Sequence, residues 1–559
     1  MGINQLFTQQ GMFPGTDRQI TFSAENESRS EASVAINPKN PLHMIAVSKK
    51  FSKPDWYWFT VEPMVTIDGG YSWYPLPLPQ PEGGNGWTDP VISFDHQGNA
   101  HLVLEPIRFI QPDTDQIPDI EVTGIKAFRL PYGGGNWIGP QELIVGRELN
   151  GQDDKPWIAC DYGKASPWSS GSSGWVSVAS PWKGNIYIVW GVGGGLNFAR
   201  STDAGVSWTG AGNLNAGDNV PGTSNAWAPE VTVGDGGVIH VVWHSPGSAS
   251  ILYVRSIDGG ETFESQQTIV NGVQGLRSPP LPQTGSWPEF PGGKFRIVTL
   301  CTGCATGNRF LVSWSDIREG YARIYYHYSD DAGASWAPSS GQPLWPSLSS
   351  SSAVQQFHPQ MVVDGKGVVG CAFYEFGQQP PSTQYRIRTR IMGSFDAGSS
   401  FGLPANVSDN PWDPAVNAPW AHFNPNDTFI GEYFGLDGGP DGFELVCTDT
   451  RTGVQELFYD HIATSKVDAP SWFTEGIVAT FMSPGVGLGA GGFVIVGGKI
   501  VKVPPRDPLF ALLQTIVTLD AARDIDHPAG RKLVKEVGEA MVDIVGDIAG
   551  EGINSRGKG

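Results

Sequence analysis

Ser329-Asp330-Asp331-Ala332-Gly333-Ala334-Ser335-Trp336 is one copy of an eight-residue pattern that occurs five times in this chain. The pattern reads Ser or Thr, any residue, Asp, any residue, Gly, any residue, Ser or Thr, and then an aromatic residue. The other copies are Thr66–Trp73, Ser201–Trp208, Ser256–Phe263 and Ser394–Phe401. Five copies of one pattern predict repeated copies of one structural unit.

Each part of the pattern has a physical role. The Asp carboxylate can accept backbone N–H bonds inside its own turn, and Gly supplies the positive φ that such a turn needs. The closing Trp or Phe offers a large apolar side chain that anchors the hairpin. We therefore interpret these Asp residues as structural and expect them to fix the fold, not to form an active site.

The pattern resembles the Asp-box, or bacterial neuraminidase repeat, of the sialidase-like β-propellers, over about Glu31 to Ile462. The resemblance implies that each box joins the outer two strands of a propeller blade, on the face away from the ligand site. Because one fold carries many functions, the resemblance predicts the fold far more specifically than it predicts an activity.

A second repeated signal lies ahead of the boxes and consists of two apolar runs separated by a polar turn. The units begin near Ala32, Asp89, Lys155, Pro229, Arg277 and His358. The gap between Asp68 and Asp203 is about twice the other gaps, and Phe128–Trp137 sits inside it, with the glycines and the Trp but without the Asp. Such units cannot bury both faces alone, so we expect stacked blades closed into a ring.

A last unit extends from about Thr428 to Ile462 and has no box. Its expected strands are Phe429–Phe434, Glu444–Cys447 and Glu456–Tyr459. Arg18–Ser23 would supply a fourth strand and hold both ends of the ring in one blade. We therefore expect an all-β, seven-bladed β-propeller over residues 18–465, after an N-terminal segment of residues 1–17. Six blades is the alternative, because the sialidases that the pattern resembles have six.

Residues 466–559 have a different character. Ser483–Gly498 is Gly-rich and apolar, and helices are expected over Leu509–Ala522 and Pro528–Ala549. The second helix has an apolar stripe, formed by Leu533, Val537, Met541, Ile544, Val545 and Ile548. The stripe fits a helical hairpin packed on the ring, and it fits equally an assembly or protein-docking element over residues 507–549.

Composition excludes several classes of partner. The net charge of −20 argues against nucleic acid and against an anionic membrane surface. No apolar run is long enough to span a membrane. Residues 1–13 lack the features of a secretory signal, whereas the family resemblance suggests an extracellular or surface protein. Of the five cysteines, Cys301 and Cys304 form the one close pair, for which a local disulfide or two buried thiols are expected rather than zinc.

Polar residues at the beginning of the innermost strands are the candidate site. Candidate catalytic residues are Asp89, Asp154, Glu432 and Tyr433, and candidate ligand-binding residues are Arg29, Glu31, Lys155, Glu230, Arg277 and His358. Such a ring could bind a polyhydroxylated ligand through carboxylates and cations. The alternative is a solvated channel mouth whose charges compensate one another.

The resemblance implies what a sialidase would need: an Arg cluster to hold the sugar carboxylate, a Tyr nucleophile assisted by Glu, and a separate acid. Glu432 with Tyr433, and Asp89 or Asp154, could fill the last two roles. The Arg cluster is incomplete, with only Arg29 and Arg277 at strand entries, and the Phe/Tyr-Arg-Ile-Pro motif is missing. The leading hypothesis is a sialidase-like, carbohydrate-directed propeller that binds glycans or cleaves a terminal sugar, and the alternative is a non-catalytic protein-interaction scaffold.

No cofactor is expected, although two acidic loops could hold Ca²⁺. The first contains Asp113, Asp115, Asp119 and Glu121, and the second contains Asp437 and Asp441. Neither has a defined ligand spacing, and solvated acidic turns explain both loops as well.

Overall fold

The structure is a computed structural model that divides into two compact units, Thr16–Ile462 and a second made of Met1–Gly15 with Ala463–Gly559. It describes residues 8–24, 27–81, 86–110, 119–149, 151, 153–168, 178–276, 283–284, 287–346, 354–378, 383–421, 424–468, 477–478, 492–496 and 499–503.

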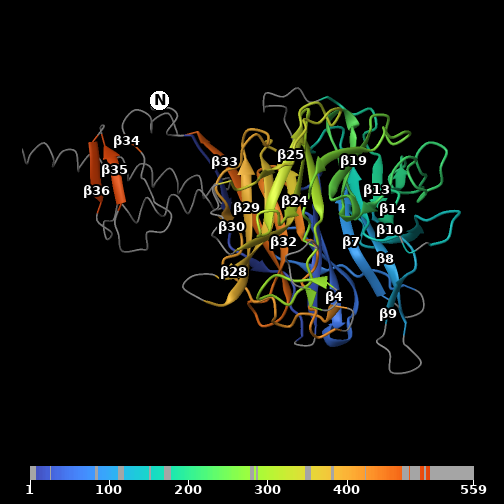
Figure 1. The fold of residues 1–559 in the computed structure, drawn as a ribbon, viewed down its shortest axis with the longest axis horizontal. Coiled ribbons are helices and arrows are strands. Elements are labelled where there is room, and N and C mark those ends of the chain that lie inside the picture. The colour runs from blue at the N-terminus through green and yellow to red at the C-terminus, as the bar shows by residue number, and fades with distance from the viewer. Residues whose placement is uncertain are drawn as a thin grey trace, which may run out of the picture. The chain divides into compact units, whose positions relative to one another are not determined.

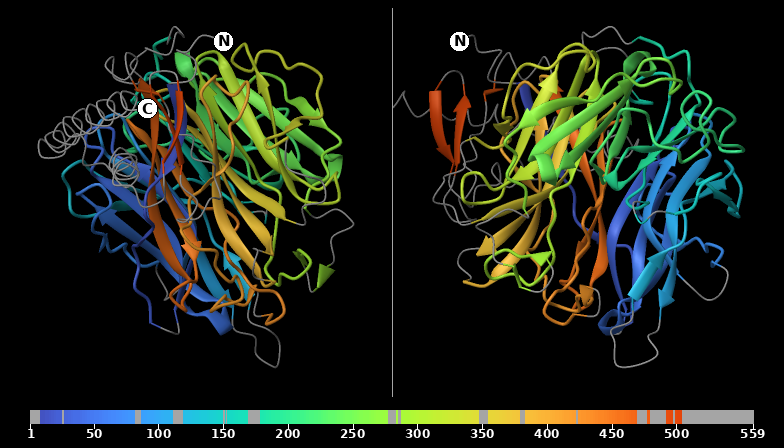
Figure 2. Two further views of the ribbon diagram at one scale, coloured as in Figure 1. Left: turned by 90° about the vertical axis from the view of Figure 1, so that its left-hand side faces the viewer. Right: turned by 45° about the vertical axis from the view of Figure 1, so that its right-hand side comes forward.

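The larger unit contains seven antiparallel sheets that form the blades (Figures 1 and 2). Blade 1 consists of β3 (Ser28–Ile36), β4 (Met44–Lys53), β5 (Trp58–Thr66) and β6 (Tyr74–Pro75). Blade 2 consists of β7 (Gly86–Phe94), β8 (Ala100–Ile110), β10 (Lys126–Leu130) and β11 (Ile138–Glu142). Blade 3 consists of β12 (Trp157–Cys160), β13 (Ile186–Trp190) and β15 (Asn197–Ser201). Blade 4 consists of β17 (Glu230–Val233), β18 (Ile239–Ser245), β19 (Ser250–Ser256) and β20 (Gln267–Asn271). Blade 5 consists of β23 (Cys301–Thr306), β24 (Arg309–Asp316), β25 (Arg323–Ser329) and β26 (Gln342–Pro343). Blade 6 consists of β27 (Gln355–Val363), β28 (Val369–Gln378), β29 (Tyr385–Ser394) and β30 (Ala405–Asn406). Blade 7 contains β31 (Gly435–Gly438), β32 (Gly442–Asp449) and β33 (Glu456–Asp468).

The innermost strands close into a ring. Contacts connect β3, β7, β12, β17, β23, β27 and β31 in this order, and β31 contacts β3 again. The expected seven-bladed propeller is therefore confirmed. Between neighbouring blades the alternating apolar residues of the strands pack into successive cores; one example joins Trp190 and Ile188 of blade 3 to Val103 of blade 2.

The N-terminal strand completes the last blade. β2 (Arg18–Gln19) pairs antiparallel with β33, with Arg18 opposite Tyr459 and Gln19 opposite Phe458. The backbone N–H of Ile20 continues the ladder by donating to Leu457. Residues from both ends of the ring thus share one sheet, as the sequence predicted.

The repeated boxes form the same turn in each blade. Each follows the third strand of blade 1, 3, 4, 5 or 6. In the copy around Asp331, the carboxylate accepts bonds from Ser329 Oγ at 2.7 Å, Ser335 N at 2.9 Å and Ser335 Oγ at 2.6 Å. Gly333 has φ +75°, and a Cβ there would lie 1.9 Å from the Tyr253 hydroxyl. Only glycine fits that position without displacing Tyr253.

The turn around the degenerate box lies where the sequence places it, because Phe128–Trp137 spans the connection from β10 to β11.

The boxes lie at the end of each blade opposite to where the innermost strands begin. In blade 1, Ile36 pairs with Met44 and Met44 with Thr66, while Ser28 pairs with Phe51 at the other end.

Two strand assignments from the sequence are wrong. The innermost strand of blade 7 is β31, not Phe429–Phe434, because Gly431 has φ +91° and Phe429 is buried against the aromatic rings of Phe51 and Tyr57. Blade 5 begins at β23 rather than near Arg277, which lies outside the described residues. The long segment ahead of β23 has no counterpart in the repeat pattern, so the pattern predicted the wrong starting residue for blade 5.

Several short elements complete the described structure. They are β9 (Asp119–Val122), which pairs with β8, the strand pairs β14 (Val192–Gly194) with β16 (Ala226–Trp227) and β21 (Gln283–Thr284) with β22 (Trp287–Pro288), and the 3₁₀ turns η2 (Pro54–Trp56), η3 (Asp235–Gly237) and η4 (Pro246–Ser248). All five cysteines are buried free thiols. Of the two alternatives for Cys301 and Cys304, a local disulfide or two buried thiols, the structure therefore has the thiols.

The smaller unit contains β1 (Thr8–Pro14) and a sheet of β34 (Ile477–Val478), β35 (Gly492–Val496) and β36 (Lys499–Val503). The helices expected over Leu509–Ala522 and Pro528–Ala549 lie outside the described residues. No helix within the described ranges has the length and apolar character needed to cross a membrane.

Candidate functional site

Five blades have a left-handed residue near the beginning of the innermost strand, either in its first four residues or just ahead of it. These residues and their φ angles are Glu31 (53°), Asp89 (47°), Lys155 (59°), Ala228 (48°) and His358 (49°). Non-glycine residues in this region cost about 1–3 kcal/mol each and persist only where the surroundings hold them. In blades 1, 2 and 6 the register of the first two strands also shifts here, which marks a bulge that interrupts the alternation of side chains.

Three of these left-handed residues meet in one buried group. Lys155 Nζ lies 3.1 Å from Asp89 Oδ2 and 3.4 Å from Glu31 Oε1. It also lies 2.7 Å from Glu432 Oε2. Lys49 Nζ contacts Glu31 Oε2 at 2.5 Å and Asp89 Oδ1 at 3.1 Å. We call Glu31, Lys49, Asp89, Glu105, Asp154, Lys155, Arg296 and Glu432 the charge cluster.

Arg296 completes the cations of the charge cluster. Its Nη2 lies 2.6 Å and its Nε 2.7 Å from Glu432 Oε1. Burial alone would raise the pKa of Glu432, but Arg296 and Lys155 outweigh it and hold that pKa at about 2. The pKa of Asp89 is likewise held well below its usual value by Lys155 and Lys49 against the effect of burial. Both carboxylates are therefore ionised.

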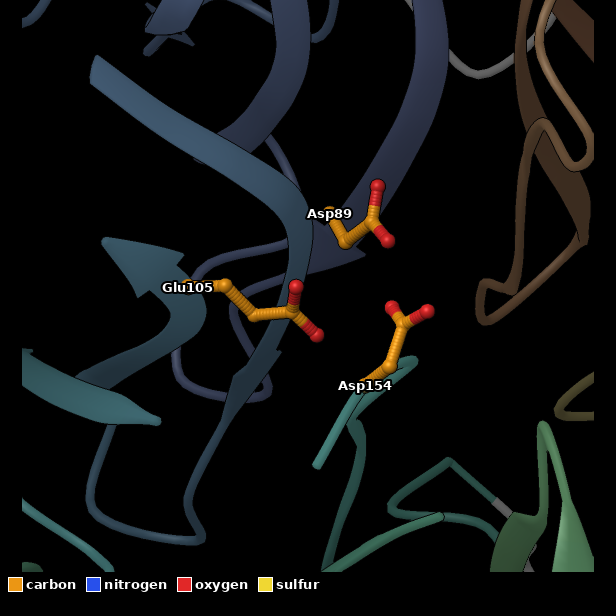
Figure 3. A group of neighbouring side chains, drawn as sticks. All are labelled: Asp89, Glu105 and Asp154. Atoms are coloured by element: carbon orange, nitrogen blue, oxygen red, sulfur yellow. The ribbon is translucent and has the colours of Figure 1, made fainter. Parts of the chain in front are cut away.

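Two further carboxyl groups of the cluster form no ion pair with any of the residues that the structure describes. The backbone N–H of Lys155 donates to Glu105 Oε1 at 2.8 Å and to Asp154 Oδ1 at 2.7 Å. Burial, followed by the nearby Asp89 charge, raises the pKa of Asp154 to about 7. Burial, with Asp154 next, raises the pKa of Glu105 well above its usual value. Figure 3 shows Asp89, Glu105 and Asp154 pointing toward one another from β7, β8 and the segment ahead of β12.

Glu432 and Tyr433 both reach the cluster because they precede β31 and are not bound by its alternation. The Tyr433 hydroxyl donates to the Pro90 carbonyl at 3.2 Å, and Lys155 Nζ lies 5.8 Å from the centre of the Tyr433 ring. Burial raises the pKa of Tyr433 well above its usual value. The Glu432 oxygens accept from Arg296 and Lys155, so Glu432 does not assist Tyr433 as a sialidase nucleophile requires.

The structure places the other sequence candidates in different surroundings. Arg29 is buried outside the cluster, in ion pairs with Glu62 and, at 3.8 Å, with Glu456. Because of the bulge at Glu31, the side chains of Arg29 and Glu31 contact different neighbours although the two residues are close in sequence. His358 is buried, neither ring nitrogen has a hydrogen-bond partner among the described residues, and burial lowers its pKa to about 3. Arg277 lies outside the described residues.

Sequence reasoning missed Lys49, Glu105 and Arg296. Lys49 and Glu105 lie on the second strands of blades 1 and 2, opposite the bulges, where they pair with Ser30 and Thr88. A charged residue inside an apolar run was the available signal, since burial of an unpaired charge is strongly unfavourable. Arg296 lies ahead of β23 in a segment without a repeat pattern, so no sequence signal identifies it.

A cavity of about 180 Å³ lies inside the ring and is lined by residues from all seven innermost strands. Glu230 and Trp157 line it, and both also line a smaller cavity that includes Asp89 and Lys155 of the charge cluster. Glu230 Oε1 accepts from Thr302 Oγ1 at 2.8 Å and from Gly303 N at 3.0 Å. Burial nevertheless raises the pKa of Glu230 to about 8.

Asp437 is a second carboxyl group of this axial cavity. It accepts from the backbone N–H groups of Ile36 at 2.9 Å and Gly438 at 2.8 Å, yet burial raises its pKa to about 7. The sequence placed Asp437 in an acidic loop that could hold Ca²⁺ or form a solvated turn. In the structure Asp437 lies on β31 and lines the axial cavity. The cavity thus offers carboxyl groups that can donate as well as accept hydrogen bonds, together with the half-buried Trp157 ring.

Comparison with known proteins adds a likeness of fold. No protein-family profile and no curated protein matches the chain. A protein of unknown function from Dyadobacter fermentans is similar at 16% identity and TM-score 0.40, over 68% of this chain and 98% of its own. The NanB sialidase of Streptococcus pneumoniae is similar at 10% identity and TM-score 0.38, over 64% and 66% of the two chains. A polysaccharide lyase of family PL25, an ulvan lyase, is similar at 13% identity and TM-score 0.36, over 77% and 97%.

Proposed function

We propose that this propeller is carbohydrate-directed and binds a neutral sugar in the axial cavity. The observation that carries the proposal is that Trp157 and Glu230 both line that cavity. They lie on β12 and β17, innermost strands that contact each other. An apolar or aromatic wall with a few placed polar groups is typical of small-molecule sites. The resemblance of the five box turns to Asp-boxes supports the same class of ligand.

A neutral sugar fits the charges better than sialic acid does. A sugar carboxylate needs a free guanidinium fork, and Arg296 is bound to Glu432 while Arg29 is bound to Glu62. The cavity itself contains the carboxyl groups of Glu230 and Asp437, which would repel an anion once ionised. Sugar hydroxyls, by contrast, can pair with both forms of a carboxyl group.

The same geometry favours binding over sialidase-type hydrolysis. The retaining reaction of sialidases uses a Tyr nucleophile, and Tyr433 donates its proton to a backbone carbonyl and has a raised pKa. Asp154 retains the character of an acid near neutral pH, but Tyr433 is not activated as the nucleophile that a sialidase would pair with it. The protein is thus a lectin-like propeller in this proposal.

A glycan array combined with a fluorogenic sialoside assay tests the proposal. The expected result is retention of neutral glycans by the full chain, without turnover of the sialoside. Trp157→Ala should remove retention, whereas Trp58→Ala, whose ring stacks on Phe109 outside the cavity, should leave it unchanged. Sialoside turnover would overturn the binding-only proposal. If no glycan is retained and no sialoside is hydrolysed, the protein-interaction scaffold would be favoured.

A further inference from the structure

The charge cluster contains more carboxyl groups than cations. Among the described residues it holds five carboxyl groups and three cationic side chains, and each cation contacts at least one carboxylate. Two carboxyl groups of this site are therefore left without an ion-pair partner in the described structure. Since an uncompensated buried charge is strongly unfavourable, either protons or a bound cation must supply the missing charge.

The two uncompensated groups, Glu105 and Asp154, are next to Asp89 and form a set of possible cation ligands. One carboxylate oxygen from each of the three residues lies within 4.8 Å of the others. A single Ca²⁺ ion with bonds of about 2.3–2.6 Å can span oxygen atoms at such separations. The three side chains come from blades 2 and 3 and converge on one point (Figure 3).

A second observation, independent of the acidic character of the group, concerns Glu105. Its side chain is completely buried, and its Oε2 has no hydrogen-bond partner within the described part of the chain. Oε1 is already satisfied by the Lys155 N–H. In Figure 3 the Glu105 carboxylate points toward Asp89 and Asp154. The buried Glu105 carboxylate thus faces two other carboxylates and has one oxygen without a donor in the described structure, which suits a cation ligand.

We propose that Asp89, Glu105 and Asp154 bind one Ca²⁺ ion that links blades 2 and 3. All three donors are hard carboxylate oxygens, which favour Ca²⁺ over the softer transition metals. Asp154 is only half-buried, so water can complete the coordination sphere on that side. Lys155, bound through its ammonium group to Asp89, Glu31 and Glu432, positions the ligands through its backbone N–H. The ion would act as a structural brace at the mouth of the channel.

The test uses the full chain, stripped of metal with chelator, and two measurements. Isothermal titration with Ca²⁺ at pH 7.5 should give one site, and thermal unfolding should show a Tm higher by about 2–5 °C in millimolar Ca²⁺ than in chelator. Glu105→Gln should lose both effects. Asp154→Asn, at a half-buried position that tolerates substitution better than the fully buried Glu105, should lose them too and serves if the first variant does not fold.

Glu121→Gln is the matched control, because Glu121 is exposed, pairs with Arg108 and belongs to the acidic loop that the sequence suggested for Ca²⁺. It should retain both the titration and the Tm shift. Loss of both effects in Glu121→Gln would place the ion in that loop and overturn the proposal. An equal Tm with Ca²⁺ and with chelator, or unchanged binding in Glu105→Gln and Asp154→Asn, would also overturn it and leave protons as the compensating charge.

Discussion

Lys155 Nζ lies 2.7 Å from Glu432 Oε2, so an ion pair joins the third blade to the seventh. The same ammonium group contacts Asp89 of the second blade and Glu31 of the first. Four blades, including the first and the last, therefore meet at one side chain. This group seals the ring at the end where the innermost strands begin, while the β2–β33 pairing closes it at its edge.

Removing that ammonium group should destabilise the ring strongly. Lys155→Met leaves three buried carboxylates without a central cation, and we expect the free energy of unfolding to fall by about 3–5 kcal/mol. Chemical denaturation measures the change. The double variant Lys155→Met/Glu432→Gln should lose less free energy of unfolding than the sum of the single variants. The second substitution removes a carboxylate charge that Lys155→Met leaves without its ammonium partner.

Lys39→Met is the control for this experiment, since Lys39 is exposed and outside the cluster; it should change the stability by less than about 0.5 kcal/mol. Equal effects of Lys155→Met and Lys39→Met would mean that the cluster does not brace the ring.

The aromatic residues of the box turns should contribute measurably but moderately. Trp208 and Trp336 are half-buried, so each substitution by Ala should cost about 2–3 kcal/mol, below the range of 3–5 kcal/mol for a fully buried Trp. Ile67→Ala, at an exposed box position (68% exposed), should have almost no effect. Unchanged melting temperatures in both Trp variants would show that the turns do not anchor the blades.

The stability should fall as the pH rises past the unfolded pKa of Asp154. Asp154 has a pKa of about 7 in the folded protein against 3.8 ordinarily, so the folded state binds more protons than the unfolded state between these values. Stability from this group is complete below about pH 4 and is lost as the pH approaches 7. The half-buried position and the coupled neighbours reduce the total to about 1–3 kcal/mol.

Denaturant unfolding at pH 5 and pH 8 in chelator, compared between the wild type and Asp154→Asn, measures this effect. The wild type should lose stability relative to the variant between the two pH values, because Asn does not titrate. Parallel changes in the two proteins would contradict the assigned pKa.

The fold could be predicted from the sequence because its signals are local. Each box carries its own hydrogen-bond acceptor, its positive-φ glycine and its anchor, as Asp331, Gly333 and Trp336 illustrate. The prediction was wrong where a glycine or an insertion interrupts the repeat. Gly431 moved the last innermost strand to Gly435–Gly438, and the segment ahead of Cys301 displaced the start of the fifth blade.

The candidate site could be predicted only in part. Glu31, Asp89 and Lys155 converge because they occupy equivalent positions near the beginning of innermost strands, which periodicity reveals. Glu432 joins them from the segment ahead of β31, although the sequence placed it in a strand. Their partners could not be predicted, since Lys49, Glu105 and Arg296 enter from second strands or from outside the repeat. Their pairing depends on the bulges and on closure of the ring, which are properties of the assembled fold.

The most direct test of the central claim is the affinity of the axial cavity for a neutral glycan. Isothermal titration of the best neutral ligand from the array should give a dissociation constant that rises at least about tenfold in Trp157→Ala, since the burial of a large apolar side chain contributes about 1.5–3 kcal/mol. Glu230→Gln should weaken binding less, and Trp58→Ala should match the wild type. Affinity unchanged in both cavity variants, or no neutral glycan bound at all, would contradict the claim that this propeller binds carbohydrate in its axial cavity.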